Sequence, residues 1–158
     1  MSSSCCNKQS SSHLSWEDND SNSHFAPFGD DDNCPKCVKE GAKAVEEGNE
    51  AIREGLNLIL DNKFCEGSKL ICEGIAAVKK GVNVLRECVK KIELCHEAKE
   101  AVKQGLELIE LGVELVCEGL VEIRRGRRNE GVQKICSGSF KIQEGLEKVI
   151  ESLDCDFD

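Results

Sequence analysis

The chain has few of the residues that build aromatic pockets and catalytic sites. Its 158 residues include no Tyr, one Trp and five Phe, which argues against a large aromatic-rich cavity for a small ligand. His96 is the only histidine after residue 33, and Cys95 beside it would point elsewhere on a helix. A cysteine nucleophile in the helical region therefore lacks a histidine base beside it. We predict no enzymatic activity, no catalytic residue and no cofactor.

Long apolar runs and an excess of positive charge are also missing. No run approaches the roughly 18 apolar residues that a membrane span requires, and MSSSCCNKQSSS at the N-terminus has no apolar segment of a secretory signal. We therefore expect synthesis in the cytoplasm without a signal peptide, where cysteines begin as thiols. The net charge of −9 argues against nucleic acid as a partner.

Residues 1–33 differ in composition from the rest of the chain. They are rich in Ser, Asn and Asp and show no helical or strand period, so we predict a disordered arm. The arm carries Trp16, Phe25 and Phe28. These are either scattered hydrophobic residues in a flexible leader or side chains that dock the arm onto a neighbouring subunit.

Glycine, by contrast, is abundant and regularly spaced. The stretch EGAKAVEEGNEAIREGLNLIL (40–60) is otherwise made of helix-favouring residues, yet glycine recurs in it at every seventh position. Each such glycine costs roughly 1 kcal/mol relative to alanine in a helix. With glycine at heptad position g, apolar residues occupy positions a and d, as in IAAVKKG (75–81), which is the period of a helical seam. Both prolines, Pro27 and Pro35, precede this region.

The glycine pattern also repeats with an offset of 64 residues, so that EGSKLICEG (66–74) matches EGVQKICSG (130–138). Such self-similarity indicates an internal duplication of a helical pair. The glycine register is interrupted near 60–67 and 124–131, which predicts a turn at each place. The proposed turn and cap residues are Asp61, Asn62, Gly126 and Asn129.

We predict an all-α fold, a duplicated helical hairpin made of repeats at about 34–96 and 97–158. The segment that joins them, 87–105, contains no helix breaker before its last residue. The chain could turn near His96 and form a compact four-helix bundle, or continue as one long helix in an extended rod. We favour the bundle, because two hairpins with exposed apolar seams would bury them against each other.

Glycines in one register next to an apolar seam let two helix backbones approach closely. The gain in packing would offset their cost in helix propensity, whereas solvent-facing glycines would leave the protein poorly stable. The predicted helix-packing residues are Gly41, Gly48, Gly55, Gly67, Gly74, Gly81, Gly105, Gly112, Gly119, Gly131, Gly138 and Gly145.

Cysteine is the other abundant small residue, with eleven in the chain. The helical ones fall at heptad positions e and g, where they could be small buried hydrophobic residues. Metal binding is a second interpretation, but CPKC (34–37) is the only local chelator and lacks a second pair, so we predict no metal site. The third interpretation is disulfide cross-linking, with candidates Cys5, Cys6, Cys34, Cys37, Cys65, Cys72, Cys88, Cys95, Cys117, Cys136 and Cys155.

A basic cluster interrupts the second repeat and consists of Arg124, Arg125, Arg127 and Arg128. Its simplest interpretation is a solvated turn. A contact with the acidic residues 30–32 of a neighbouring copy is the alternative.

A small, cysteine-rich chain with a Ser-rich, CC-bearing leader and no signal peptide resembles the self-assembling proteins of bacterial spore coats and exosporia. The resemblance covers composition and residues 1–37. It implies assembly in the cytosol followed by late disulfide cross-linking, in a spore surface layer or appendage. Its implied partners are further copies of the chain and other cysteine-rich surface proteins, and no fold follows from it.

The sequence thus favours a non-enzymatic structural protein that assembles through packed helices and is cross-linked by intermolecular disulfides. Two alternatives stay open. One is a thiol-rich helical protein that binds Zn or Cu(I), and the other is a helical adaptor for a protein partner.

Overall fold

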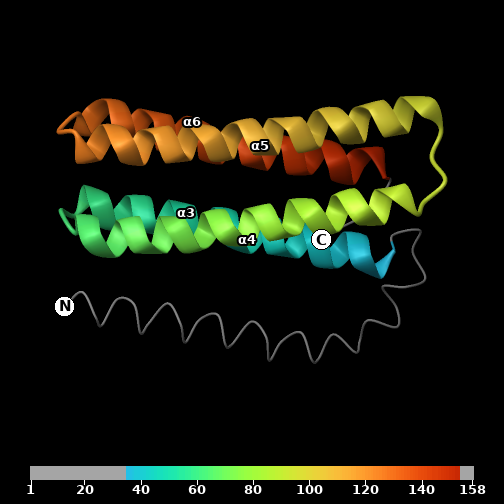
Figure 1. Ribbon diagram of the computed structural model, residues 1–158, viewed down its shortest axis with the longest axis horizontal. Helices are drawn as coiled ribbons and strands as arrows, with labels where there is room; N and C mark the ends of the chain where they lie inside the picture. Colours follow the sequence, from blue (N-terminus) through green and yellow to red (C-terminus); the bar gives the residue numbers. More distant parts are fainter. Residues whose placement is uncertain (1–34, 154–158) are drawn as a thin grey trace.

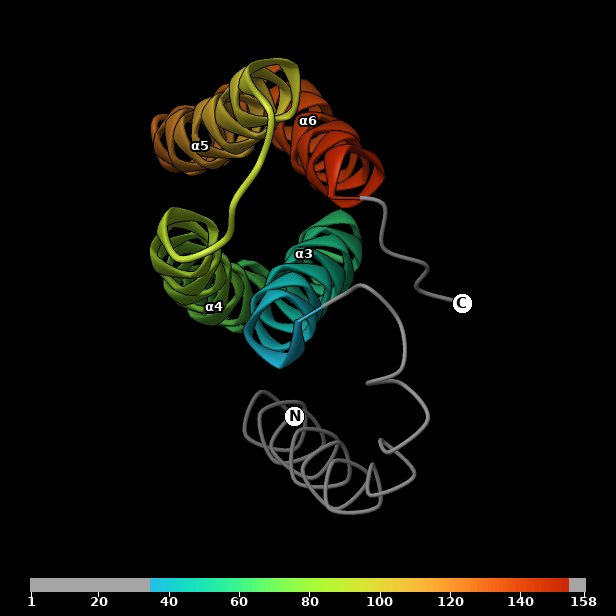
Figure 2. The same cartoon turned by 90° about the vertical axis from the view of Figure 1, so that its right-hand side faces the viewer.

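The computed structural model describes residues 35–153, and the regular elements in that range are helices. They are α3 (Lys36–Leu60), α4 (Phe64–Lys90), α5 (His96–Arg124) and α6 (Arg128–Ser152) (Figure 1). α3 packs along α4, α5 packs along α6, and the two antiparallel hairpins lie side by side as a bundle (Figure 2). The prediction of an all-α bundle of two helical hairpins is therefore confirmed.

The connection between the hairpins decides between a compact bundle and an extended rod. α4 ends at Lys90 and α5 begins at His96, so residues 91–95 reverse the chain (Figure 2). Ile92 and Leu94 in this segment are partly buried against the core. Two apolar side chains thus anchor a turn that no proline or glycine marks in the sequence.

The two hairpin turns are equivalent in the duplication and have the same geometry. Asn62 and Gly126, which are 64 residues apart, both have positive φ, 68° and 92°. The amide of Lys63 donates to the Leu58 carbonyl at 2.8 Å, and a matching bond of the same length joins Arg127 to Glu122. This is the Schellman ending of a helix, in which a left-handed residue satisfies the last carbonyls.

Both predicted turns are therefore found, at residues 61–63 and 125–127. Asp61 is the C-terminal cap of α3, as the sequence indicated. The assignment of Asn129 to a turn or cap was wrong, because α6 already begins at Arg128 and Asn129 lies in its first turn.

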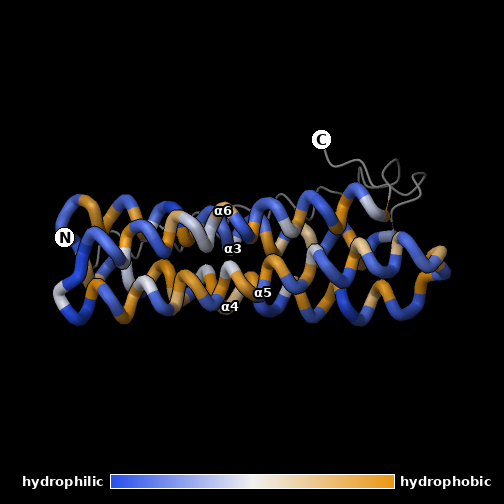
Figure 3. The backbone as a smooth tube through the Cα atoms, turned by 90° about the horizontal axis from the view of Figure 1, so that it is seen from above, coloured by the Kyte–Doolittle hydropathy of each residue, from blue (hydrophilic) through white to orange (hydrophobic). Residues whose placement is uncertain are grey.

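The hydrophobic core is built from heptad positions a and d of all four helices. Figure 3 shows hydrophobic positions recurring along each helix between hydrophilic ones, as the heptad pattern requires. β-Branched and leucine side chains dominate this core. The largest of its fully buried side chains are Ile52, Ile71, Leu85, Ile109, Ile135, Ile142 and Leu146.

The heptad glycines lie where the two helices of a hairpin meet. Each glycine of one helix faces the backbone carbonyl of a glycine on its partner helix, and all twelve are buried. The facing pairs are Gly41–Gly81, Gly48–Gly74 and Gly55–Gly67 in the first hairpin, and Gly105–Gly145, Gly112–Gly138 and Gly119–Gly131 in the second. The prediction that the glycines pack helices together, rather than face solvent, is confirmed.

The packing at these sites leaves no room for a side chain. A Cβ added to Gly48 would lie 2.5 Å from the Gly74 carbonyl oxygen and 2.7 Å from Cγ2 of Val78. Backbone contacts this close favour Cα–H···O bonds and dispersion, which offset the low helix propensity of glycine. We refer to each row of facing glycines as a glycine seam.

Replacing a seam glycine should therefore destabilise the protein, although alanine is the better helix former. We expect Gly48→Ala to lower the free energy of unfolding by about 2 kcal/mol or more through overpacking. Asn83→Ala at an exposed site on α4 is the control, and it should change stability by less than about 1 kcal/mol. Denaturant unfolding measures both, and a Gly48→Ala protein as stable as the parent would contradict the seam.

Polar side chains of α3 and α6 meet in the core between the hairpins. Asn49 on α3 and Ser139 on α6 are 3% and 4% exposed. Ser139 Oγ donates to Asn49 Oδ1 at 2.8 Å, and Asn49 Nδ2 donates to the Ser139 carbonyl at 3.2 Å. The duplication places Val113 and Ile75 at the equivalent positions of the α4·α5 interface, and both are buried core residues. The α3·α6 interface is thus polar at this level, and the α4·α5 interface is apolar.

Exchanging the polar pair for its apolar counterpart tests this contact. Ser139→Ile alone would keep the bond to the carbonyl of residue 139 but leave Asn49 Oδ1 buried without its donor, which should cost about 1–3 kcal/mol of stability. Asn49→Val together with Ser139→Ile should recover most of that loss. Thermal or denaturant unfolding of the single and double variants measures the difference. Equal stability of the two variants would show that the Asn49 amide does not depend on Ser139.

Arg128 joins the turn ends of the two hairpins. Its guanidinium donates to Asn62 Oδ1 at 2.7 Å and to the carbonyls of Leu60 at 3.0 Å and Ile59 at 3.1 Å. These are carbonyls at the C-terminal end of α3, where a cation is favourably placed against the helix dipole. One member of the basic cluster therefore has a structural role that the sequence did not reveal.

Candidate functional site

The cysteines are the candidate functional residues, and the fold divides those it describes into a bonded pair and a set of free thiols. Cys37 at the start of α3 and Cys88 near the end of α4 form a disulfide, with their Cα atoms 6.0 Å apart. Cys88 is buried, and the bond closes the first hairpin at its open end. The equivalent positions of the second hairpin hold Ala101 and Ser152. These two cysteines bond to each other and are not available to other chains in this state.

Five further cysteines of the described range are free, and all of them are exposed. Cys65 and Cys72 lie on α4, Cys117 on α5 and Cys136 on α6, while Cys95 is the N-cap of α5. The four on helices share heptad position e, beside the interface between the hairpins and away from the glycine seams. The interpretation of these cysteines as small buried hydrophobic residues does not hold. Cys88 is buried, but it is bonded to Cys37.

Several sequence-derived candidates fall outside residues 35–153. For the cross-linking set these are Cys5, Cys6, Cys34 and Cys155. The proposed docking residues of the arm, Trp16, Phe25 and Phe28, lie outside the described residues as well.

Metal ligands do not converge in the part of the chain that the structure describes. Within residues 35–153 no three His, Cys, Asp or Glu side chains form a group that could hold an ion. Cys37, one half of the CPKC pair, is already bonded to Cys88. A four-ligand zinc site would need most of its ligands from residues outside this range or from another molecule.

Cys117 has the most strongly perturbed environment among the free thiols. Partial burial between the helices raises its pKa above the usual value, Lys79 on α4 opposes the rise, and negative charge on Cys72 adds to it. Glu114 and Glu118 on its own helix also raise the pKa. A raised pKa lowers the thiolate fraction at neutral pH, so Cys117 should react more slowly than an ordinary exposed thiol.

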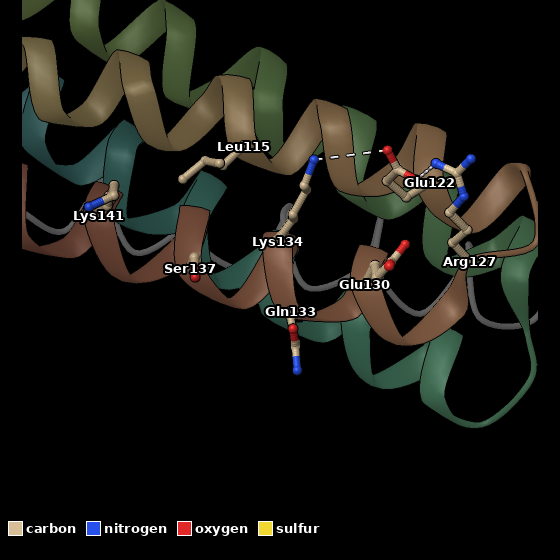
Figure 4. A pocket seen from close by; sticks show the side chains of 8 residues that line it. All are labelled: Leu115, Glu122, Arg127, Glu130, Gln133, Lys134, Ser137 and Lys141. Atoms are coloured by element: carbon tan, nitrogen blue, oxygen red, sulfur yellow. Dashed lines mark hydrogen bonds and ion pairs between the residues drawn. The ribbon is translucent and has the colours of Figure 1, made fainter.

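One surface depression lies on the outer side of the α5·α6 hairpin and has a volume of about 530 Å³. Its charges neutralise one another: Arg127 bonds Glu122 at 2.8 Å, and Lys134 lies 3.9 Å from the same carboxylate (Figure 4). The Arg127 hydrogen bond lowers the pKa of Glu122. This shallow, self-paired surface does not resemble a ligand pocket. It is lined by Leu115, Glu122, Arg127, Glu130, Gln133, Lys134, Ser137 and Lys141.

The basic cluster is solvent-exposed, as expected of a turn. Two of its members are nevertheless engaged within the chain: Arg127 pairs with Glu122, and Arg128 caps α3. The alternative, an ionic contact with a neighbouring copy, stays a prediction for Arg124 and Arg125.

No protein-family model, curated protein or solved structure matches this chain. Among residues 35–153, none of the helices has both the length and the apolar character needed to cross a bilayer. The chemistry of the site must therefore be inferred from its own geometry.

The charges around Cys117 predict how its reactivity depends on pH. Because its pKa is raised, the alkylation rate of Cys117 should reach half its maximum at a higher pH than that of a free cysteine. Cys72→Ser should lower that midpoint and Lys79→Met should raise it, whereas Cys136→Ser on the far side should leave it unchanged. Labelling with iodoacetamide over a pH series, followed by peptide mass spectrometry, gives the three midpoints. A Lys79→Met midpoint at or below that of the parent would contradict the assignment.

Proposed function

We propose that this chain is a non-enzymatic structural protein that assembles with copies of itself and is cross-linked through disulfides. The observation that carries the proposal is the set of five exposed free thiols on a helical bundle. Exposed thiols are a liability for a protein without a use for them, since they react with oxidants and with other disulfides.

The thiols are spread along the bundle rather than gathered at one point. Cys65 lies near the turn ends of the hairpins, and Cys95 lies at the opposite end, beside the connection between them. α4, which runs from one of these ends to the other, has 27 residues, which corresponds to about 40 Å. Bonds formed at the two ends would extend an assembly along the bundle axis, and bonds through Cys136 would extend it sideways.

The scaffold also suits a mechanical role. The glycine seams fill each hairpin interface with backbone, and the Cys37–Cys88 bond covalently fixes the first hairpin. That bond requires an oxidising step during the life of the protein. The same step would convert exposed thiols of neighbouring chains into cross-links. A bacterial spore surface layer, where proteins made in the cytosol are oxidised late, fits this sequence of events, and other cysteine-rich surface proteins would then be partners.

The proposal predicts oligomers that depend on oxidation. Protein purified without reductant and run on a denaturing gel should give a ladder that collapses to a 17.4 kDa band when a thiol reductant is added. Combined Cys65→Ser, Cys95→Ser and Cys136→Ser should shorten the ladder markedly, because the exposed thiols at the ends and side are gone. Cys5→Ser with Cys6→Ser in the parent measures the share carried by the arm.

Cys37→Ser with Cys88→Ser is the control, since it removes two cysteines that do not face other chains. It should lower thermal stability and leave the ladder in place. A monomer in both lanes, or a ladder unaffected by every exposed-thiol variant, would overturn the proposal. Metal analysis of that monomer would then test the alternative of a thiol-rich metal-binding protein.

A further inference from the structure

The α4·α5 interface brings two of the free thiols to the same level. Asn49 and Ser139 meet across α3·α6, so their duplicates Val113 and Ile75 mark one level of α4·α5. Cys72 lies three residues before Ile75, and Cys117 lies four residues after Val113. Because the helices are antiparallel, both cysteines are displaced from this level in the same direction along the bundle axis. The displacements are about 4.5 Å for Cys72 and about 6 Å for Cys117. With the register of α3·α6 carried over to α4·α5, the two cysteines differ by only about 1.5 Å in height.

The two thiols also face the same interface. Both occupy heptad position e, next to the buried a positions of Ile75 and Val113. In the duplicated interface, Arg53 stands at the position of Cys117, and its Nε donates to Ser139 Oγ on the opposite helix at 3.1 Å. A side chain at this position thus points across to the other hairpin. The electrostatics agree, because Cys72 and Lys79, both on α4, act on Cys117.

We infer that Cys72 and Cys117 form a second intramolecular disulfide, which joins the two hairpins to each other. The oxidant is a small-molecule disulfide such as oxidised glutathione. The Cys72 thiolate attacks one sulfur of that disulfide, releases one thiolate and leaves a mixed disulfide on Cys72. The Cys117 thiolate then attacks Cys72 Sγ and releases the second thiolate. Two protein thiols are oxidised and one disulfide is reduced to two thiols.

Cys72 takes the first step because the raised pKa of Cys117 slows the reaction of that thiol with small-molecule disulfides. Burial raises this pKa and keeps more of Cys117 in the thiol form at neutral pH. Once the mixed disulfide exists, the second attack is intramolecular, and proximity offsets the lower thiolate fraction.

Formation of this bond would change the α4·α5 interface between the hairpins more than it would change the packing within either hairpin. A disulfide requires Cα atoms closer than about 7 Å. The helices within a hairpin are already in backbone contact through the glycine seams, whereas the hairpins lie further apart (Figure 2). The bond would draw α4 and α5 together at one level and would connect residues on both sides of the 91–95 turn. It would also leave Cys65, Cys95 and Cys136 for bonds between chains.

Peptide mapping of the full chain tests the pairing directly. The protein is diluted until it is monomeric, treated with oxidised glutathione, alkylated and digested with trypsin. Cleavage at Lys and Arg isolates Cys72 in residues 70–79 and Cys117 in residues 104–124, each with no other cysteine. We expect these two peptides joined by a disulfide in the monomer. Recovery of both as separate alkylated or glutathione-bearing peptides would overturn the inference.

A matched pair of variants gives a second readout. Cys72→Ser and Cys136→Ser change equivalent positions of the two repeats, and Cys136 has Arg53 opposite it instead of a thiol. Oxidation should raise the Tm of Cys136→Ser by roughly 10 °C more than that of Cys72→Ser, as expected for a loop of this length, because the Cys37–Cys88 bond is available to both variants. Equal shifts in the two variants would contradict the pairing. Because the assay uses monomer, its outcome is separate from whether chains cross-link to one another.

Discussion

Close contact between glycine backbones is the constraint on which the rest of this structure depends. Because each glycine faces the carbonyl of a glycine on the partner helix, the rotation of both helices about their axes is fixed. Positions a and d must then face the other hairpin, where they form the core, and positions b and f must face solvent. Position e is left at the edge of the interface between the hairpins. The exposed helical thiols all occupy this edge, so the glycines determine where the reactive groups lie.

The two halves share this framework but differ where they meet. The first hairpin has the Cys37–Cys88 disulfide and the second has no counterpart to it. One lateral interface contains the Asn49–Ser139 contact, while the other contains isoleucine and valine at the same level. A bundle of two identical hairpins could pair its faces in more than one way. The polar contact favours the arrangement in which Asn49 and Ser139 meet, since any other would bury both without partners.

Much of this fold could be predicted from the sequence, because glycine spacing is a strong and repeated signal. The helices, the seams, the duplication and both hairpin turns follow from it. The turn at 91–95 could not be predicted with the same certainty, because it is anchored by tertiary burial of Ile92 and Leu94 and not by a breaker. The Cys37–Cys88 pairing was equally hidden, since eleven cysteines allow many pairings and heptad position alone distinguishes none of them. Arg128 had looked like a member of a charge cluster, and its bonds to α3 depend on how the hairpins meet.

The seven-residue spacing of the glycines has a consequence for folding accuracy. If one helix of a hairpin slides by one heptad, two of its three glycine pairs form again with new partners, such as Gly41 with Gly74. The glycine seam therefore permits several nearly equivalent registers of the two helices, and it does not by itself select one. The short turn selects the native register, because its left-handed Asn62 or Gly126 allows only three residues between the helices. In the first hairpin the disulfide at the far end fixes that choice covalently, whereas the second hairpin has no such bond among residues 96–153.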